Sequence, residues 1–230
     1  MTWQTLGELT LNLSFVLYCV WFFPQLLLNA KRQDTRGLSY LMHALLFVGY
    51  FADLMYGFGR HMQWQYRAVT VIGLCCLALQ HYQIARYGLR ARYEKQWFYA
   101  FTLAMVALLV FAILQITIIG HSKTYYDIAG LVSGACWFLF SLPQIVVNFR
   151  HRSTQGLSIS FVVISLLICI FDNISAWALG WDYPSKIGLP LTLLKKGLLL
   201  GQMVYYRRQV SSRRLDQASQ TRSNRSLTSA

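Results

Sequence analysis

Four charged side chains stand inside long apolar stretches of this 230-residue sequence: Asp53, Asp172, Lys195 and Lys196. An ionisable group at the centre of a bilayer costs about 2.5 to 3.5 kcal/mol, so such residues face a protein interior and mark functional sites. Two carboxylates and two ammonium groups around one cavity would suit a zwitterionic solute such as an amino acid. A static buried ion pair, for instance between Asp172 and one of the lysines, is an equally weighted alternative.

Other polar residues recur at helical spacing around these charges. Ser165 lies seven residues before Asp172, and residues seven apart share a helix face. Adjacent lysines lie about 100° apart on a helix, so only one of the pair can point straight into a cavity. We therefore expect a polar bundle interior, and the residues assigned to the solute or proton path are Asp53, Asp172, Lys195, Lys196, Ser165, Asn148, Asn29, Tyr50, His43 and Thr192.

The composition is that of a membrane protein, with 56% hydrophobic and 13% charged residues. A helix needs about 20 apolar residues to cross the hydrocarbon core, and seven segments come near that length. The sequence therefore predicts an all-α integral membrane protein with seven transmembrane helices in one bundle. The segments run over residues 12–30, 38–58, 68–87, 97–119, 126–149, 158–178 and 187–206.

The net charge of +13 is explained by membrane topology. Basic residues gather after the first, third, fifth and seventh segments, so the positive-inside rule predicts an external or lumenal N-terminus and a cytosolic C-terminus. We therefore expect no nucleic-acid partner. Residues 209–230 are polar, basic and Ser-rich, which predicts a disordered cytosolic tail that contacts anionic lipid.

An internal repeat organises the chain. Residues 22–39, "FFPQLLLNAKRQDTRGLS", align without a gap to "LPQIVVNFRHRSTQGLS", which ends at Ser158, when shifted by 119 positions. The same shift pairs Asp53 with Asp172. Two three-helix units separated by one helix run in the same direction, an arrangement found in transporters. The predicted units are a first repeat (1–95), an inverting linker helix (96–120), a second repeat (121–208) and the tail (209–230).

Each repeat carries a proline followed by glutamine inside its first helix: Pro24 and Gln25, then Pro143 and Gln144. Proline removes a backbone N–H and clashes with the carbonyl four residues earlier, so both helices should loosen there. In lipid the freed carbonyls need partners, and we expect the two glutamine amides beside the breaks to supply them. The four residues are predicted hinges at which the first and fifth helices swing.

These paired Pro-Gln motifs, each followed by Asn and by a basic T-x-G-L-S turn, resemble the PQ-loop family. That family includes cystinosin, lysosomal cationic amino-acid exporters and, more distantly, the SWEET sugar transporters. The resemblance covers about residues 15–208 and is closest to cystinosin in the second repeat, at "LPQIVVNFRHRSTQGLSI" and "PSKIGL". It implies a 3+1+3 bundle that transports by alternating access, from the lumen to the cytosol.

The sequence departs from the cystinosin pattern at two acidic positions. The proton-linked acid of the sixth helix aligns with Ser165, and a further acid of the last helix falls near Lys196 or Gly197. Either Asp172 replaces the missing acids as proton carrier, or Lys196 is a permanent countercharge and protons are not needed. We expect no cofactor, with protons as the candidate coupling ion.

The leading hypothesis is a proton-coupled secondary transporter for a small polar solute, most simply an amino acid. The alternatives are a non-transporting receptor or scaffold, similar to the KDEL receptors, and a SWEET-like sugar carrier. No catalytic motif is present, and the five cysteines lie in apolar segments without a CxxC pair, so we expect neither an enzyme nor a metal site. The membrane is endolysosomal for a eukaryotic chain and the inner membrane for a bacterial one, and the oligomeric state is left open.

Overall fold

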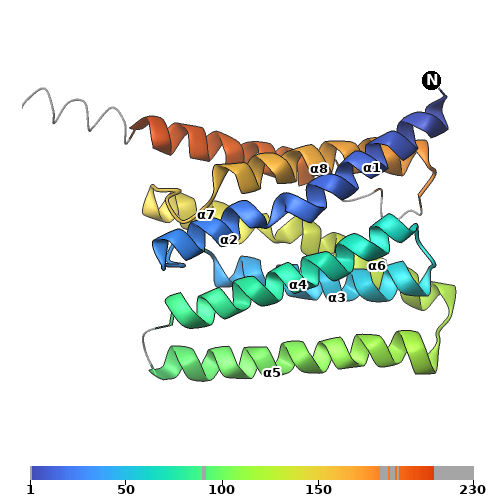
Figure 1. The fold of residues 1–230 in the computed structure, drawn as a ribbon, viewed down its shortest axis with the longest axis horizontal. Coiled ribbons are helices and arrows are strands. Elements are labelled where there is room, and N and C mark those ends of the chain that lie inside the picture. Colours follow the sequence, from blue (N-terminus) through green and yellow to red (C-terminus); the bar gives the residue numbers. More distant parts are fainter. Residues whose placement is uncertain (1, 90–91, 182–185, 187–189, 191, 210–230) are drawn as a thin grey trace, which may run out of the picture.

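The computed structural model describes residues 2–89, 92–181, 186, 190 and 192–209, and Figure 1 shows its helices lying side by side along the long axis. The predicted tail lies outside the described residues from residue 210 onward. The helices are α1 (Trp3–Trp21), α2 (Phe23–Arg32), α3 (Tyr40–Gly59), α4 (Trp64–Tyr87), α5 (Arg92–Leu114) with a π-helical extension (Gln115–Ile119), α6 (Lys123–Leu139), α7 (Ser141–His151), α8 (Ile159–Ala178) and a last helix over residues 192–209.

The predicted all-α membrane fold is confirmed. Six of the described segments are long and apolar enough to span a bilayer: Trp3–Arg32, Tyr40–Gly59, Trp64–Tyr87, Glu94–Ile119, Lys123–His151 and Ile159–Ala178. The helix over 192–209 follows them as the seventh. The first span begins at Trp3, earlier than the predicted residue 12, because the Thr2 hydroxyl accepts a hydrogen bond from Thr5 N–H and caps the helix.

The predicted breaks before the two prolines are confirmed. The first span is interrupted at Phe22, between α1 and α2, and the fifth at Phe140, between α6 and α7. Pro24 then lies in the first turn of α2, where a missing backbone N–H costs nothing. Each long span therefore consists of two helices joined at one residue.

The T-x-G-L-S sequences form two equivalent turns at the same end of the bundle. Both α2 and α7 end on a residue with positive φ, Gln33 at 45° and Arg152 at 47°. Ser39 and Ser158 then cap α3 and α8, each hydroxyl accepting a backbone N–H of the first helical turn. We call the end of the bundle that carries these turns the basic end.

Helices from different repeats pair closely. Among α1 to α8, the two most extensive helix pairings are α1 with α8 and α3 with α6. A shift of 119 residues converts α1 into α6 and α3 into α8, so each pairing is the counterpart of the other. The linker helix α5 lies at the edge of the bundle against α3 (Figure 1).

The two turns meet backbone to backbone through a pair of glycines. Gly37 has a φ of +93°, which favours glycine, and Gly156 lies directly against it. A Cβ added to Gly156 would come 2.7 Å from both Arg36 O and Gly37 Cα. Because those atoms belong to the backbone, a side chain at residue 156 could only be accommodated by separating the turns.

Gly156→Ala is therefore expected to destabilise the protein by roughly 1 to 3 kcal/mol, the usual cost of overpacking. The measurement is the midpoint of thermal unfolding in detergent. Gly201→Ala is the matched control, since a Cβ there meets nothing within 4 Å in a helix that alanine favours by up to about 1 kcal/mol. An equal midpoint for the two variants would contradict the close contact of the turns.

Candidate functional site

The first Pro-Gln glutamine binds the turn of the second repeat. Gln25 Nε2 donates to Gly156 O at 3.1 Å, and Gln25 Oε1 accepts from Ser158 N–H at 2.9 Å. The side chain is completely buried. Its amide thus forms hydrogen bonds with backbone groups of the other repeat. The prediction that this amide donates to the carbonyls freed at its own helix break is wrong.

The second glutamine makes the reciprocal contacts. Gln144 Nε2 donates to Gly37 O at 2.8 Å, and Gln144 Oε1 accepts from Ser39 N–H at 3.0 Å. Gln144 is also completely buried. We call these two glutamines and the turns they bind, residues 35–39 and 154–158, the glutamine clamp.

The two predicted asparagines, Asn29 and Asn148, hydrogen-bond to the clamp glutamines. Each accepts from the clamp glutamine one helical turn earlier and donates to a glutamine on a neighbouring helix, which in turn donates to a backbone carbonyl. The two chains of contacts are Gln25–Asn29–Gln83–Leu26 O and Gln144–Asn148–Gln202–Ile145 O.

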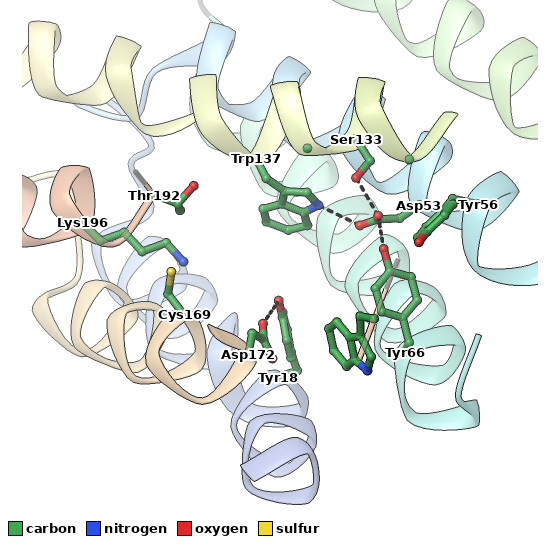
Figure 2. Close-up of a pocket in the computed structure, with 13 residues that line it drawn as sticks. Tyr18, Asp53, Tyr56, Tyr66, Ser133, Trp137, Cys169, Asp172, Thr192 and Lys196 are labelled. Atoms are coloured by element: carbon green, nitrogen blue, oxygen red, sulfur yellow. Dashed lines mark hydrogen bonds between the residues drawn. The ribbon is translucent and has the colours of Figure 1, made fainter. Parts of the chain in front are cut away.

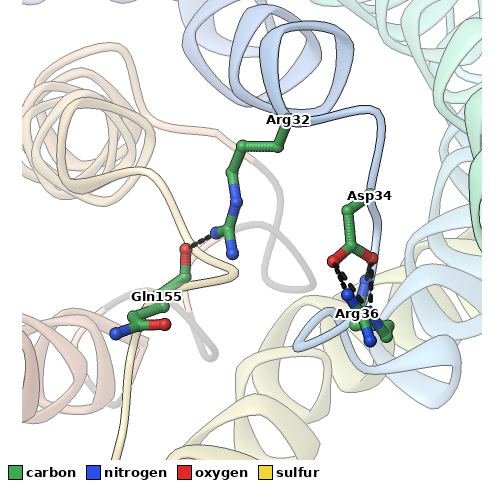
Figure 3. A network of polar contacts seen from close by, with 4 residues as sticks. All are labelled: Arg32, Asp34, Arg36 and Gln155. Carbon is green, nitrogen blue, oxygen red and sulfur yellow. Dashed lines mark hydrogen bonds and ion pairs between the residues drawn. The ribbon is translucent and has the colours of Figure 1, made fainter.

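The outer rim of the clamp is not symmetric (Figure 3). Arg32 donates to the backbone carbonyl of Gln155 in the other repeat, whereas Arg36 forms an ion pair with Asp34 at 2.8 Å in its own turn. The hydrogen bonds from Arg36 lower the pKa of Asp34 to about 2. Asp34 therefore keeps its charge over the physiological pH range, and the rim does not titrate through this group.

An aromatic layer separates the clamp from the bundle interior. Trp21 stacks on Phe161 at 5.0 Å between ring centroids, and its indole N–H donates to Phe161 O at 3.0 Å. Phe22 and Phe140, the residues at the two helix breaks, belong to the same buried apolar cluster. Along the first span this layer lies between Tyr18, which lines the cavity described next, and the clamp.

The polar interior is a cavity of about 100 Å³ between the two repeats (Figure 2). Its wall includes Asp53, Asp172, Lys196 and Thr192, four of the residues predicted from sequence. A neighbouring cavity of about 50 Å³ shares both aspartates and is also lined by Tyr50. The structure thus brings the two carboxylates and one lysine to one site.

Asp53 accepts hydrogen bonds from three neutral donors. Ser133 Oγ lies at 2.6 Å and Trp137 Nε1 at 2.7 Å, both from α6 in the second repeat, and the hydroxyl of Tyr66 on α4 completes the set. Figure 2 shows Ser133, Trp137 and Tyr66 converging on the carboxylate. The carboxylate is therefore held at the repeat boundary without a cation.

Asp172 has the equivalent partners on α1. It accepts from the Ser14 hydroxyl and from the Tyr18 hydroxyl, the latter at 3.0 Å. Ser14 and Tyr18 correspond to Ser133 and Trp137 after the shift of 119 residues. In each repeat, the aspartate thus accepts hydrogen bonds from the first helix of the other repeat.

Of the two adjacent lysines, Lys196 faces the cavity. Its ammonium donates to the backbone carbonyl of Ser165 at 2.8 Å and lies 5.7 Å from the centre of the Trp21 ring. Lys195 points elsewhere, with its ammonium 3.8 Å above the ring of Phe138 and no hydrogen-bond partner among the described residues. The alternative of a static Asp172–lysine pair is not realised, because no such ion pair occurs within 4 Å in the described part of the chain.

Two further predicted residues take different places. Ser165 contributes its backbone carbonyl to Lys196, while its hydroxyl donates to Val162 O at 3.2 Å. His43 does not reach the central cavity: it lies 3.3 Å from His81 on the side of the bundle facing α5. The structure therefore places His43 outside the set formed by the two aspartates and Lys196.

Sequence reasoning missed the donors that hold the carboxylates: Ser14, Tyr18, Tyr66, Ser133 and Trp137. One signal for them was available, since Ser14 and Ser133 match under the shift that reveals the repeat. Their partners were not predictable, because both contacts cross from one repeat to the other.

Ser133→Ala is expected to destabilise the protein by about 1 to 3 kcal/mol, since it removes a donor from the buried Asp53 carboxylate. Ser141→Ala is the matched control: Ser141 is equally buried, but its hydroxyl has no hydrogen-bond partner among the described residues. Thermal unfolding of the two variants in the same detergent measures the difference. A Ser133→Ala protein as stable as Ser141→Ala would show that the contact to Asp53 contributes nothing.

A family model for the PQ loop repeat matches residues 6–66 and 125–185. The two matches are offset by 119 residues, the shift found within the sequence, and together they cover more than half of the chain. Among solved structures, a eukaryotic SWEET transporter has the same fold, with a TM-score of 0.66 and 13% identity over 88% of this chain and 99% of that one.

Two curated relatives are similar in sequence. Cystinosin of Drosophila melanogaster is 25% identical over 224 residues, covering 84% of this chain and 56% of that protein. A vacuolar histidine transporter of Saccharomyces cerevisiae is 43% identical over 61 residues, 26% of this chain and 21% of that protein. The chain spans about half, or less, of the length of these relatives. With both repeats matched and the Pro-Gln motifs paired in the fold, the chain belongs to the PQ-loop family.

Proposed function

We propose that this protein is a secondary transporter for a small polar solute, most simply an amino acid. The observation that carries the proposal is the cavity between the two repeats, which Asp53, Asp172 and Lys196 all line. Transporters of repeat architecture bind their solutes at such interfaces. Support also comes from the relatives, whose names describe vacuolar transporters of histidine and of lysine and a cystine transporter.

The charges of the cavity are complementary to a zwitterion. The ammonium of Lys196 is the only part of the wall that offers a positive charge to a carboxylate, among the described lining residues. Asp172 and Asp53 accept hydrogen bonds from neutral donors and form no ion pair with a described residue, so a solute ammonium could pair with either carboxylate. A cavity of about 100 Å³ also favours a single small solute over the peptide tail that a KDEL-receptor-like protein would bind.

In this proposal the glutamine clamp is the gate at the basic end, and the breaks at Phe22 and Phe140 are the hinges. The two repeats (1–95 and 121–208) move about these hinges while the linker (96–120) joins them. The basic end faces the cytosol, as the positive-inside rule requires, and the solute passes from a lumenal compartment to the cytosol. A vacuolar membrane fits the yeast relatives, whose names describe vacuolar transporters.

Asp172 is the proposed proton carrier. It takes the role because Ser165 stands at the position where cystinosin-like transporters carry an acid, and because its carboxylate lines the same cavity as Lys196. Binding of a proton would neutralise one of the two buried carboxylates when the solute leaves. If Lys196 instead serves as a permanent countercharge, transport would proceed without a proton gradient.

Purified protein in liposomes is expected to take up one or a few amino acids saturably, and faster with an inward proton gradient from pH 5 to pH 7.5. Asp172→Asn should abolish the stimulation by the gradient and lower uptake at least tenfold, because the carboxylate that binds the proton is lost. Lys196→Met should raise the KM for the same solute, since it removes the group proposed to bind the solute carboxylate.

Asp127→Asn is the control for both variants. Asp127 pairs with Arg60 at 2.9 Å, away from the cavity wall, so this change removes a carboxylate without touching the proposed site. Saturable uptake of sugars alone would support the SWEET-like alternative. Binding of a peptide without uptake of any solute would overturn the transporter proposal in favour of a receptor.

The hinge proposal predicts two distances between the turns at the basic end. Spin labels at Lys31→Cys and Gln155→Cys, in a background without the native cysteines, should report a short distance with the clamp closed and a longer one when the transported solute is present. Gln25→Leu with Gln144→Leu should shift the population toward the longer distance without solute. A single distance under all conditions would contradict the role of the clamp as a gate.

A further inference from the structure

The two repeats place different side chains at equivalent positions around the solute cavity. Beside Asp172, the side chains that line this cavity from α8 and the last helix are Cys169, Thr192 and Lys196. The shift of 119 residues converts these three, in order, into Tyr50 on α3 and Gly73 and Leu77 on α4. None of the three counterparts lines the solute cavity, although Asp53 of the same repeat does. We call the part of the cavity beside Cys169, Thr192 and Lys196 the second-repeat lobe, and the equivalent space beside Gly73 and Leu77 the first-repeat lobe.

The side chain of Tyr50 fills the first-repeat lobe. It is 1% exposed, and its ring packs so closely against α4 that a Cβ added to Gly73 would overlap it. The same ring meets the ring of Trp137 edge to face, with 5.0 Å between the centroids, and Trp137 lines the solute cavity. In the second repeat the smaller Cys169 stands at the position of Tyr50, and the space beside it belongs to the cavity (Figure 2). One tyrosine thus accounts for the difference between the two lobes.

The ring of Tyr50, and not its hydroxyl, makes the contacts at this position. The hydroxyl has no hydrogen-bond partner among the described residues, and a buried hydroxyl without a partner destabilises a folded protein. The cavity of about 50 Å³ that Tyr50 lines shares Asp53, Asp172 and Trp137 with the solute cavity. Removal of the Tyr50 ring would therefore enlarge a space that adjoins the solute site.

We propose that Tyr50 sets the upper size limit of the transported solute by filling the first-repeat lobe. This inference rests on the transporter proposed above. Without the ring, the lobe would end on Gly73 and Leu77, the apolar counterparts of Thr192 and Lys196. An amino acid bound between Lys196 and the aspartates would place an aromatic side chain in that apolar space. With Tyr50 present, the space is occupied, and amino acids with a bulky aromatic side chain are excluded.

The first test is uptake of phenylalanine by the full chain in liposomes, because its benzyl group resembles the side chain that Tyr50→Ala removes. This variant should take up phenylalanine at least tenfold faster than the wild-type chain, and should still take up the smaller amino acids that the wild-type chain transports. Tyr126→Ala is the matched control, since Tyr126 is 5% exposed and packs on Gly59 as Tyr50 does on Gly73, but lines neither cavity. Its uptake of phenylalanine should equal that of the wild-type chain.

Equal uptake of phenylalanine by the wild-type chain and Tyr50→Ala, beside uptake of a smaller amino acid, would overturn the proposal. An equal gain in Tyr126→Ala would overturn it as well, because loosened packing outside the site would then be sufficient. Uptake of no amino acid by any of the three proteins would overturn the transporter proposal, and the packing of the first-repeat lobe is then decided by a measurement without transport.

That measurement is the midpoint of thermal unfolding in detergent. Para-cresol, the tyrosine side chain as a free molecule, should raise the midpoint of Tyr50→Ala and leave that of the wild-type chain unchanged, because the lobe is open in the variant alone. Tyr50→Leu serves where the alanine variant does not fold: Gly73→Ala should lower the midpoint of the wild-type chain but not that of Tyr50→Leu, since the added methyl overlaps the tyrosine ring. The same shift in both members of either comparison would show that Tyr50 does not fill the lobe.

Discussion

The hydrogen-bonding needs of two turns determine how the halves of this protein fit together. Gly37 O and Ser39 N–H lie in a turn where no helix supplies partners, and a hydrogen bond to such a group contributes about 0.5 to 1.5 kcal/mol. Gln144 supplies one donor and one acceptor to that turn, and Gln25 does the same for the other. Neither repeat therefore supplies all the hydrogen-bond partners of its own turn. The same exchange recurs deeper in the bundle, where Asp53 and Asp172 accept from the first helix of the opposite repeat.

The two repeats differ in the residues that they contribute around the cavity. Lys196 occupies the position that Leu77 holds in the first repeat, and Lys195 the position of Cys76. One of these substitutions adds an ammonium to the cavity, and the other places an ammonium over Phe138. Both aspartates are retained, so the site has a negative side in each repeat but a positive group in the second only. A solute with two different charged ends would thus be held in one orientation, which a perfectly symmetric site could not enforce.

The sequence predicts the parts of this structure that depend on local spacing. Apolar length gives the spans, proline gives the breaks at Phe22 and Phe140, and the shift of 119 residues gives the repeat. What it does not predict is the rotation of each helix about its axis, because that is set by packing against other helices. For this reason the partners of Gln25 and Gln144 were assigned to their own helices, His43 was assigned to the solute path, and the choice between Lys195 and Lys196 stayed open. The contacts that decide these points all join residues more than thirty positions apart.

The hydrogen bonds of the glutamine clamp and the contacts that a bound zwitterion could make in the cavity contribute free energies of similar size. Exchange between a closed and an open basic end is therefore feasible. Four glutamine–turn hydrogen bonds at about 0.5 to 1.5 kcal/mol each would hold the basic end closed by about 2 to 6 kcal/mol. Reversing a population from 1:99 to 99:1 takes about 5.5 kcal/mol of differential binding. Two charge-assisted contacts from a zwitterion, at about 1.5 to 3 kcal/mol each, come close to that requirement. The two sites are also linked, since the Lys196 ammonium lies 5.7 Å from the centre of the Trp21 ring, directly before the break at Phe22, and 5.9 Å from that of Phe140 at the other break. A solute that draws Lys196 toward its carboxylate would therefore act first on the layer that supports the clamp.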